Sequence, residues 1–414
     1  MSKFKSAFLN VMVERGFYNQ CTNEPGFDAY LYECETKGVP AVAYHGADPT
    51  ADSLHVGHLV PVMMMRWFQK VGHKPIMLVG GATARVGDPS GKDKLRPFLD
   101  EATLQKNIAG LKKSDSNFIK FGKGKNDALM VDNWDWFQNI NYLDFLRDVG
   151  TYYSVNRMLT MDSVKARLER EQPMSFLEFN YQLLQGYDFC VLLEKYGCRA
   201  QLAGSDQWGN IVSGTELGRR RNDTEIFGFT CPLIMDSAGK KMGKSEGNAV
   251  WVNDDKLPAY DYWQYFRNVG DLDVGKCLRT FTDLPMDEVK RLEALKDSEI
   301  NEAKKILANE ATKLCRGEKE AKLAMETAVR VFEQGQAGGG LPLIDFVDGM
   351  SVLDAFVAIG FVESKGEARR LIKQSGLKLN DKVVTDENYK LTQADMVDGQ
   401  IKLSQGKKKH GIVK

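Results

Sequence analysis

Short apolar runs, each leading into a polar turn that contains glycine or aspartate, recur along the first 250 residues. Stretches with apolar residues at helical spacing separate these runs. Strands that alternate with helices are typical of a parallel sheet of βαβ units, where ligands bind beyond the carboxyl ends of the strands. The pattern therefore predicts a doubly wound α/β domain over about 1–250, with a site in its polar turns. The predicted strand runs and their following turns span 39–44, 75–84, 128–131, 198–210 and 229–235.

The strand signals disappear after about residue 254. Segments such as "DEVKRLEAL" and "EKEAKLAMETAVRVFEQ" are rich in Ala, Glu, Lys and Leu at helical spacing, which predicts an all-helical domain over 251–337. The glycine-rich stretch "GQAGGGLP" then breaks the pattern and predicts a linker at 338–349. A helix at "GEARRLIKQ" and the short strands after it predict a small α+β unit over 350–414.

The composition, 43% hydrophobic and 27% charged residues in a chain of 414, is that of an ordinary globular protein with two or three domains. No window approaches the roughly 18 uninterrupted apolar residues of a membrane span, so we expect no membrane partner. The seven cysteines contain no Cys-x-x-Cys pair, and Glu14 and Arg15 interrupt the N-terminal apolar stretch. We therefore expect a cytoplasmic protein with reduced thiols.

The charge is distributed unevenly although Lys and Arg (56) balance Asp and Glu (56) over the whole chain. From Ser364 to the end there are 12 basic and 6 acidic residues, so this tail carries +6 and the rest of the chain −6. A basic C-terminal unit on an acidic body predicts a polyanionic partner for the tail.

Two of the five histidines, His55 and His58, flank Gly57 where a helix is predicted to begin. A helix start offers free backbone N–H groups and the positive end of the helix dipole, and a glycine lets a flat ligand approach the backbone. The arrangement suits a nucleotide, with its base over the glycine and its phosphates near the histidines. Two alternatives stay open: structural histidines at a helix start, and a zinc site, for which no further ligand lies at suitable spacing.

A second motif, "KKMGKS", places Lys241, Lys244 and Ser245 around Gly243. Two lysines on a glycine loop can close over a triphosphate and stabilise the charge that grows as pyrophosphate leaves. The alternative is a solvated run of charges.

Polar residues also form a stripe on the apolar helix predicted at 176–189. Tyr181, Gln185 and Asp188 fall at i, i+4 and i+7, and therefore on one face. Burying a carboxylate or an amide is unfavourable unless the group is paired. The stripe therefore predicts either an internal hydrogen-bond network or a pocket for a small polar ligand.

Two polar turns complete the candidate chemistry. Asp206 and Gln207 follow a strand at a position suited to ribose hydroxyls, although aspartate in a turn is ordinary. The turn "GDPSGKDKLR" contains Asp88, Lys92 and Arg96. Its Gly-Lys pair lacks the Ser or Thr that a P-loop requires next, so the sequence does not predict a P-loop.

The order of the His-Val-Gly-His and Lys-Met-Gly-Lys-Ser motifs resembles that of class I aminoacyl-tRNA synthetases. "DPTADSLHVGHLVP", "GDPSGK", "NYQLLQGYDF" and "GSDQWGN" are similar to motifs of the bacterial tyrosyl-tRNA synthetases, and "ESKGEARRLIKQSGLKLNDKVV" resembles their S4 domain. The resemblance covers nearly the whole chain. It implies a Rossmann-like catalytic domain over 1–250, an anticodon-binding-type helical domain over 251–337 and an S4-like RNA-binding domain over 350–414.

The resemblance also implies a role for each matching residue. Tyr44 and Asp188 would bind the phenolic hydroxyl of tyrosine, and Gln207 would lie near its carboxylate. The ammonium group would meet Asp88, Tyr181 and Gln185. The implied ATP site comprises Gly46, Asp48, Gly57, His58, Asp206 and Lys244. The implied catalytic residues around the phosphates and the leaving pyrophosphate are Thr50, His55, His58, Lys92, Arg96, Lys241, Lys244 and Ser245.

The activity implied is the activation of L-tyrosine by ATP to tyrosyl-adenylate, followed by transfer of tyrosine to the 3′ end of tRNA(Tyr). Mg²⁺ would be carried by ATP, with no dedicated protein ligands. Family members are homodimers joined through an insertion that here spans about 130–180. The implied RNA-binding residues are Lys365, Arg369, Arg370, Lys373, Lys378 and Lys407.

This chain departs from the family pattern at two places. His45 replaces a cysteine that touches the ribose in relatives, which puts that contact in doubt, and Ala84-Arg85 replaces Gly-Leu. Alternatives to the family's activity are a small-molecule nucleotidylyltransferase and an RNA-binding protein with a decayed synthetase core. Tryptophan is the nearest alternative substrate, but its indole offers a donor and no hydroxyl oxygen.

Overall fold

The computed structural model describes residues 3–89, 99–245, 248–333, 341–397, 399–406 and 409–414. The chain divides into two compact units. The first comprises Met1–Lys256 and Gly270–Ile300, and the second comprises Leu257–Val269 and Asn301–Lys414. This division differs from the predicted domain boundaries, because part of the predicted helical domain belongs to the unit that contains the large sheet.

A six-stranded sheet forms the centre of the first unit, with strand order β1-β6-β5-β2-β3-β4. Strands β2 to β6 are parallel, as predicted, and β1, which the pattern did not predict, pairs antiparallel with β6. Both β3 and β5 are almost entirely buried, which explains their nearly continuous apolar sequence. The strands are β1 Gln20–Cys21, β2 Val42–Ala47, β3 Lys74–Val79, β4 Leu129–Asp132, β5 Ala200–Gly204 and β6 Phe227–Cys231.

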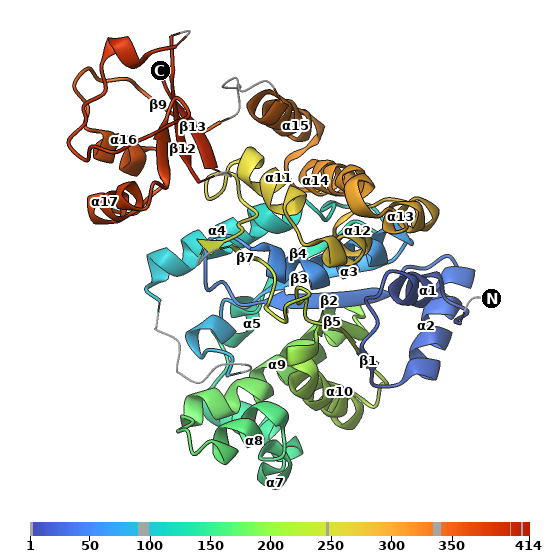
Figure 1. Cartoon of the computed structure of the whole chain (residues 1–414). Helices are drawn as coiled ribbons and strands as arrows, with labels where there is room; N and C mark the ends of the chain where they lie inside the picture. The colour runs from blue at the N-terminus through green and yellow to red at the C-terminus, as the bar shows by residue number, and fades with distance from the viewer. Residues whose placement is uncertain (1–2, 90–98, 246–247, 334–340, 398, 407–408) are drawn as a thin grey trace. The chain divides into compact units, whose positions relative to one another are not determined.

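Most helices of the first unit lie beside this sheet, whereas α7 (Val155–Met158) and α8 (Asp162–Glu169) lie away from it (Figure 1). The other helices of this unit are α1 Ala7–Glu14, α2 Glu24–Thr36, α3 Leu59–Lys70, α4 Glu101–Ser116, α5 Trp134–Phe137, α6 Tyr142–Asp148, α9 Phe176–Tyr196, α10 Trp208–Asn222, α12 Val274–Phe281 and α13 Met286–Glu293. A short hairpin pairs β7 (Lys244–Ser245) with β8 (Asn248–Ala249).

An aromatic cluster packs α1, α2 and α3 against β6. The Phe8 ring meets the Phe68 ring edge-on at 5.0 Å between centroids, and Phe27 stacks on Phe227 at 5.2 Å. Such pairs add about 0.5–1.5 kcal/mol to the stabilisation that burial provides. This packing fixes α3, and with it the histidine-containing turn that precedes α3, against the sheet.

Helix α9 carries the polar stripe predicted from the sequence. A capping box at its start, in which Ser175 and Glu178 each bond the other's backbone N–H, fixes where the helix begins. Tyr181, Gln185 and Asp188 are all buried on it. The helix predicted at 176–189 is therefore confirmed and extends to Tyr196.

Within the described residues, the second unit contains five helices and a small sheet. The helices α11 (Ala259–Arg267), α14 (Ile300–Arg316) and α15 (Glu318–Glu333) are rich in the helix-forming residues that predicted them. The sheet has strand order β11-β10-β12-β13-β9, with α16 and α17 beside it. Its elements are β9 Leu343–Ile344, α16 Val352–Ala358, α17 Lys365–Lys373, β10 Leu377–Leu379, β11 Lys382–Val383, β12 Ile401–Gln405 and β13 Lys409–Val413.

Within the described residues, no helix is long and apolar enough to cross a membrane. The seven cysteines all lie in described segments and none of them forms a disulfide.

Candidate active site

The histidine turn, defined here as residues 55–58, lies between β2 and α3. Residues Val56–His58 form a single 3-10 turn that leads into α3, close to the predicted helix start. The two imidazole rings stack with their centroids 3.7 Å apart. The His55 Nδ1 accepts a hydrogen bond from the Gly57 N–H at 3.0 Å, so in the neutral ring the proton lies on Nε2. His55 is thus itself a capping residue, while His58 is exposed.

The lysine loop, defined here as residues 240–245, packs on the histidine turn. A Cβ atom built on Gly243 would lie 2.4 Å from the Gly57 nitrogen, and one built on Gly57 would lie 2.9 Å from the Met242 carbonyl oxygen. The φ of Gly243 is +98°, a value that other residues rarely adopt. In this structure the backbone of the lysine loop, instead of open space, therefore faces Gly57.

A network of buried polar groups lines the carboxyl ends of β2, β3 and β4. The Asp48 carboxylate accepts hydrogen bonds from the Thr83 hydroxyl at 2.7 Å and the Tyr181 hydroxyl at 3.0 Å. The Asp188 carboxyl, only 2% exposed, accepts from the Asn133 amide at 3.1 Å and the Trp136 indole at 2.9 Å. Tyr181 and Asp188 of the stripe on α9 therefore take part in an internal hydrogen-bond network, which is one of the two predicted alternatives.

Burial raises the pKa of Asp188 to about 8, although its two hydrogen bonds act in the opposite direction. Tyr44 lies fully buried at the centre of the sheet with its ring 5.1 Å from that of Phe189. Among the described residues its hydroxyl has no hydrogen-bond partner. Burial first, and then the charge of Asp188, raise the pKa of Tyr44 well above its ordinary value.

The Tyr181 hydroxyl, which donates to Asp48, is also subject to the charge of other carboxylates. Burial raises the pKa of Tyr181 well above the ordinary value, and the charges of Asp48, Asp88 and Asp188 raise it further. The Asp88 carboxylate accepts a hydrogen bond from the Gln207 amide at 2.8 Å, which joins two turns that the sequence singled out separately. Such a concentration of negative charge favours a cationic group.

Two residues that the sequence assigned to the nucleotide and the leaving pyrophosphate, Asp206 and Lys241, interact electrostatically. Burial raises the pKa of Asp206, the charge of Asp88 raises it further, and the charge of Lys241 lowers it. The charge of the lysine loop therefore acts on at least one other predicted site residue. Two other predicted site residues are exposed: Gly46 near the end of β2, and Thr50 in the turn after it.

The two departures from the family pattern each have a local role. The His45 Nδ1 lies 3.0 Å from the Leu202 carbonyl oxygen and donates to it, which leaves Nε2 as an acceptor in the neutral ring. Burial lowers the pKa of His45 to about 4, so the ring is neutral near pH 7. The Arg85 guanidinium lies over the Trp134 ring, 3.8 Å from its centroid.

Some predicted residues cannot be placed. Lys92, Arg96 and Lys407 lie outside the described residues, as do the side chains of Lys244 and Ser245. Sequence reasoning also missed Thr83, Asn133 and Trp136. The available signal for the last two was their position in the polar turn "DNWDW", directly after a predicted strand. In the described parts of the chain, no cluster of three or more His, Cys, Asp or Glu side chains could hold a metal ion.

Of the predicted RNA-binding residues within the described segments, four lie on α17 and Lys378 lies on β10. Arg369, Arg370 and Lys373 are exposed on this helix. Lys365, at its start, pairs with Asp354 at 2.7 Å, and Arg369 lies 3.7 Å from Glu387. Ion pairs this exposed contribute little to stability, so these cations can exchange partners readily.

The fold and the two motifs define a class I aminoacyl-tRNA synthetase, and the comparison with family models agrees. Residues 36–333 match the model described as tRNA synthetases class I (W and Y), and residues 353–397 match the S4 domain. Among curated proteins, a tyrosine–tRNA ligase of Wolbachia sp. subsp. Brugia malayi is 53% identical, over 99% of this chain and 98% of its own. The chain belongs to the tyrosine–tRNA ligase family.

Further relatives support this assignment. The tyrosine–tRNA ligase of Rhodospirillum rubrum is 52% identical over 100% of this chain and 99% of its own. A C-terminally truncated mitochondrial tyrosyl-tRNA synthetase of Aspergillus nidulans gives a TM-score of 0.70 at 30% identity, covering 78% of this chain and 94% of that one.

Proposed function

We propose that this enzyme activates L-tyrosine with ATP and then esterifies tRNA(Tyr). The observation that carries the proposal is the buried Tyr44 hydroxyl, which has no partner among the described residues, on a ring that packs against Phe189, the residue after Asp188. A buried hydroxyl left unpaired costs about 1–3 kcal/mol. The phenolic hydroxyl of tyrosine can donate to one of these groups and accept from the other, whereas phenylalanine can do neither.

The ammonium group of the substrate would lie near the Tyr181 hydroxyl, because Asp48 and Asp88 concentrate negative charge there. Gln185, buried one turn further along α9, would assist, and Gln207 would lie beside the substrate carboxylate. This arrangement supports an α-amino acid as the substrate.

In the first step a carboxylate oxygen of tyrosine attacks the α-phosphorus of ATP. A C–O–P linkage forms, the bond between the α-phosphorus and the bridging oxygen breaks, and pyrophosphate leaves with the bonding electrons. The step needs no general base, because the carboxylate is already ionised. It needs alignment and donors directed at the charge that grows.

The groups proposed to supply these donors are Thr50, His55, His58, Lys92, Arg96, Lys241, Lys244 and Ser245. Gly46, Asp48, Gly57 and Asp206 would line the nucleotide site. Mg²⁺ would arrive on the ATP phosphates as part of the substrate. In the second step a terminal ribose hydroxyl of the tRNA attacks the tyrosyl carbonyl and AMP leaves.

Exchange of labelled pyrophosphate into ATP, measured with each of the twenty amino acids in turn, tests the proposal. We expect exchange with tyrosine only. Exchange with tryptophan would reassign the pocket, and no exchange with any amino acid would leave a non-catalytic RNA-binding protein as the better description.

The partners proposed beyond the small substrates are tRNA(Tyr), bound through the helical domain and the S4-like domain, and a second copy of the chain in the cytoplasm. Exposed large apolar side chains support the dimer, because they gather within 142–177, in and beside α6 to α9. They are Tyr142, Leu143, Val155, Leu159, Leu168, Phe176 and Leu177. Sedimentation equilibrium measures the mass directly, and a monomer at micromolar concentration would contradict the dimer.

A further inference from the structure

We propose that Asn253 is a positioning residue for amino-acid activation, which holds the lysine loop in place on the histidine turn. This role rests on the proposed function and adds a residue that holds the catalytic loop in place. Asn253 belongs to neither motif, and follows the loop by eight residues after Ser245. Its side chain is buried, with 2% of the residue exposed.

Residues 250–253, which follow the lysine loop in sequence and end at Asn253, form a segment that we name the strap. It runs antiparallel to residues 53–56. The Val250 N–H donates to the Gly243 carbonyl at 2.9 Å, and the Val56 N–H donates to the Val250 carbonyl at 2.9 Å. The Val252 N–H donates to the Leu54 carbonyl at 2.8 Å. One backbone ladder therefore links the lysine loop to the residues that lead into the histidine turn.

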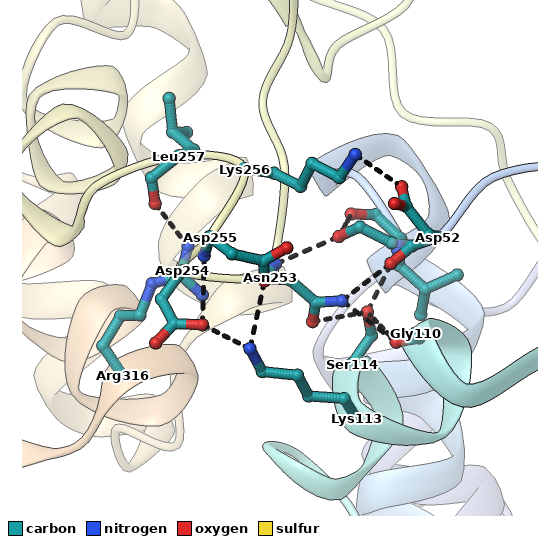
Figure 2. Close-up of polar contacts among 12 residues, drawn as sticks. Asp52, Gly110, Lys113, Ser114, Asn253, Asp254, Asp255, Lys256, Leu257 and Arg316 are labelled. Atoms are coloured by element: carbon teal, nitrogen blue, oxygen red, sulfur yellow. Dashed lines mark hydrogen bonds and ion pairs between the residues drawn. The ribbon is translucent and has the colours of Figure 1, made fainter. Parts of the chain in front are cut away.

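Asn253 ends this ladder and uses both N–H donors and the oxygen of its side-chain amide (Figure 2). Its Nδ2 donates to the carbonyl oxygens of Asp52 at 2.9 Å and Gly110 at 3.0 Å. Its Oδ1 accepts from the Ser114 hydroxyl at 2.9 Å. Its backbone N–H donates to the Ser53 hydroxyl at 3.0 Å. The side chain thus joins the strap, the approach to the histidine turn and α4.

The contacts are selective for asparagine. Aspartate would direct a carboxylate oxygen at the two carbonyl oxygens that now receive N–H donors. Alanine would remove this partner from the Asp52 carbonyl, while the Ser114 hydroxyl would keep the Gly110 carbonyl at 3.1 Å, and a buried group that loses its partner is unfavourable. The Ser114 hydroxyl also accepts from the Leu54 N–H at 3.1 Å, so it connects the same two strands of the ladder.

Ion pairs at the rim of this network provide a matched control. Lys113 lies 2.5 Å from Asp254 and 3.0 Å from Asp255, and the three side chains are 52%, 67% and 61% exposed (Figure 2). Exposed pairs of this kind are worth little. Removing Lys113 therefore changes the charge beside Asn253 without changing the buried hydrogen bonds.

A positioning role for Asn253 predicts a loss of kcat without a change in the KM for tyrosine. If Asn253 orders the lysine loop, the loop's lysines are displaced from the leaving pyrophosphate when Asn253 is replaced, while the tyrosine pocket is untouched. Displacing a catalytic group by about 1 Å can cost on the order of 100-fold in rate. In pyrophosphate exchange, Asn253→Ala and Asn253→Asp should therefore lower kcat by about 10- to 100-fold and change the KM for tyrosine by less than about 2-fold.

Three further full-length variants complete the experiment. Ser114→Ala should lower kcat in the same direction but less, and it keeps the test available if the Asn253 variants do not fold. Lys113→Ala should change neither parameter. Combining Asn253→Ala with Lys241→Ala should cost less than the product of the single losses, because both changes act on one loop.

The outcomes distinguish the inference from the proposed function. Without tyrosine-dependent exchange in the unaltered protein, the proposed function is wrong. If that exchange is present and folded Asn253→Ala retains full kcat, the positioning role is wrong and the function stands. A parallel loss of kcat and tyrosine affinity in both Asn253→Ala and Ser114→Ala would also overturn the positioning role, since it would indicate general destabilisation of the fold.

Discussion

At the scale of single residues, the Asp188 carboxyl illustrates how burial shapes this site. Its raised pKa, about 8, means that the folded protein binds a proton that the unfolded chain releases near pH 4. The free energy of unfolding therefore contains a contribution that is fully present below about pH 4. This contribution is lost progressively as the pH rises through 8, because ionising the buried carboxyl is unfavourable.

Replacing Asp188 by asparagine keeps its shape and removes this titration. Relative to the unaltered protein, Asp188→Asn should gain free energy of unfolding between pH 6 and pH 9, on the order of 1–3 kcal/mol. It should also activate tyrosine at least about 100-fold more slowly, because an amide N–H donor replaces one of the two carboxyl oxygens available to the phenolic hydroxyl. Denaturant unfolding at both pH values and pyrophosphate exchange measure the two effects.

Asp115 offers the control, since burial also raises its pKa, to about 7, and it belongs to α4 instead of the pocket. Asp115→Asn should change the pH dependence of stability in the same direction and leave the KM for tyrosine unchanged. Full tyrosine activation in Asp188→Asn would mean that the substrate pocket lies elsewhere.

Helical periodicity was sufficient to predict that Tyr181, Gln185 and Asp188 share a face, since that follows from 3.6 residues per turn. The partners of Asp188 could not be predicted in the same way. Asn133 and Trp136 lie 55 and 52 residues away in sequence, and they reach the carboxyl only because β4 pairs with β3 in a particular register. Spacing along the chain carries no information about that register.

At the scale of elements, the sequence predicted the five parallel strands and both motif-bearing turns of the first unit. It did not predict the contact between the Gly243 and Gly57 backbones, because that contact depends on a positive φ and on the ladder formed by the strap. It also predicted one helical domain over 251–337, whereas α12 and α13 group with the large sheet. Helix propensity indicates that a segment is helical, without indicating against which neighbour it packs.

The contribution of the lysine loop to activation can be tested at Lys241. Lys241 lies close enough to the site for its charge to lower the pKa of Asp206. If it acts mainly on departing pyrophosphate, Lys241→Ala should lower kcat far more than it raises the KM for tyrosine. The expected loss is about 2–4 kcal/mol, by analogy with an oxyanion-hole donor. Steady-state pyrophosphate exchange provides both constants.

The adjacent Lys240, exposed and without a role in the proposed chemistry, is the matched control for Lys241. Lys240→Ala removes the same charge one residue away and should leave kcat within about 2-fold. Equal losses in the two variants would instead indicate that only the overall charge of the loop matters, and a normal kcat in Lys241→Ala would make the loop a solvated run of charges.

At the scale of the whole molecule, charge separates the C-terminal unit from the body. The tail from Ser364 onward carries +6 in a chain whose net charge is zero. Within the tail, α17 presents Arg369, Arg370 and Lys373 to solvent. The sequence predicted this helix and the strands after it. The parallel pairing of β13 with β9 joins segments some 70 residues apart and left no signal in the sequence.

A chain that ends near Gly340 loses every strand and helix of this C-terminal sheet, whose first strand begins at Leu343. All the residues that carry the proposed activation chemistry precede that point. We therefore expect the truncated protein to form tyrosyl-adenylate, in single-turnover experiments with tyrosine and ATP, at close to the full-length rate. Aminoacylation of tRNA(Tyr) should fall by at least about 10-fold, because the phosphate contacts that the tail supplies are gone.

The salt dependence of tRNA binding distinguishes lost phosphate contacts from a general defect. Each contact releases condensed counterions, so it contributes roughly −0.7 to −0.9 to the slope of log K against log salt concentration. The truncated chain should show a shallower slope. In the full-length protein, Arg370→Ala with Lys373→Ala should remove part of the same slope and leave adenylate formation unchanged. Truncation that leaves both aminoacylation and the slope intact would mean that tRNA is held by the rest of the chain, and that the basic tail binds some other polyanion.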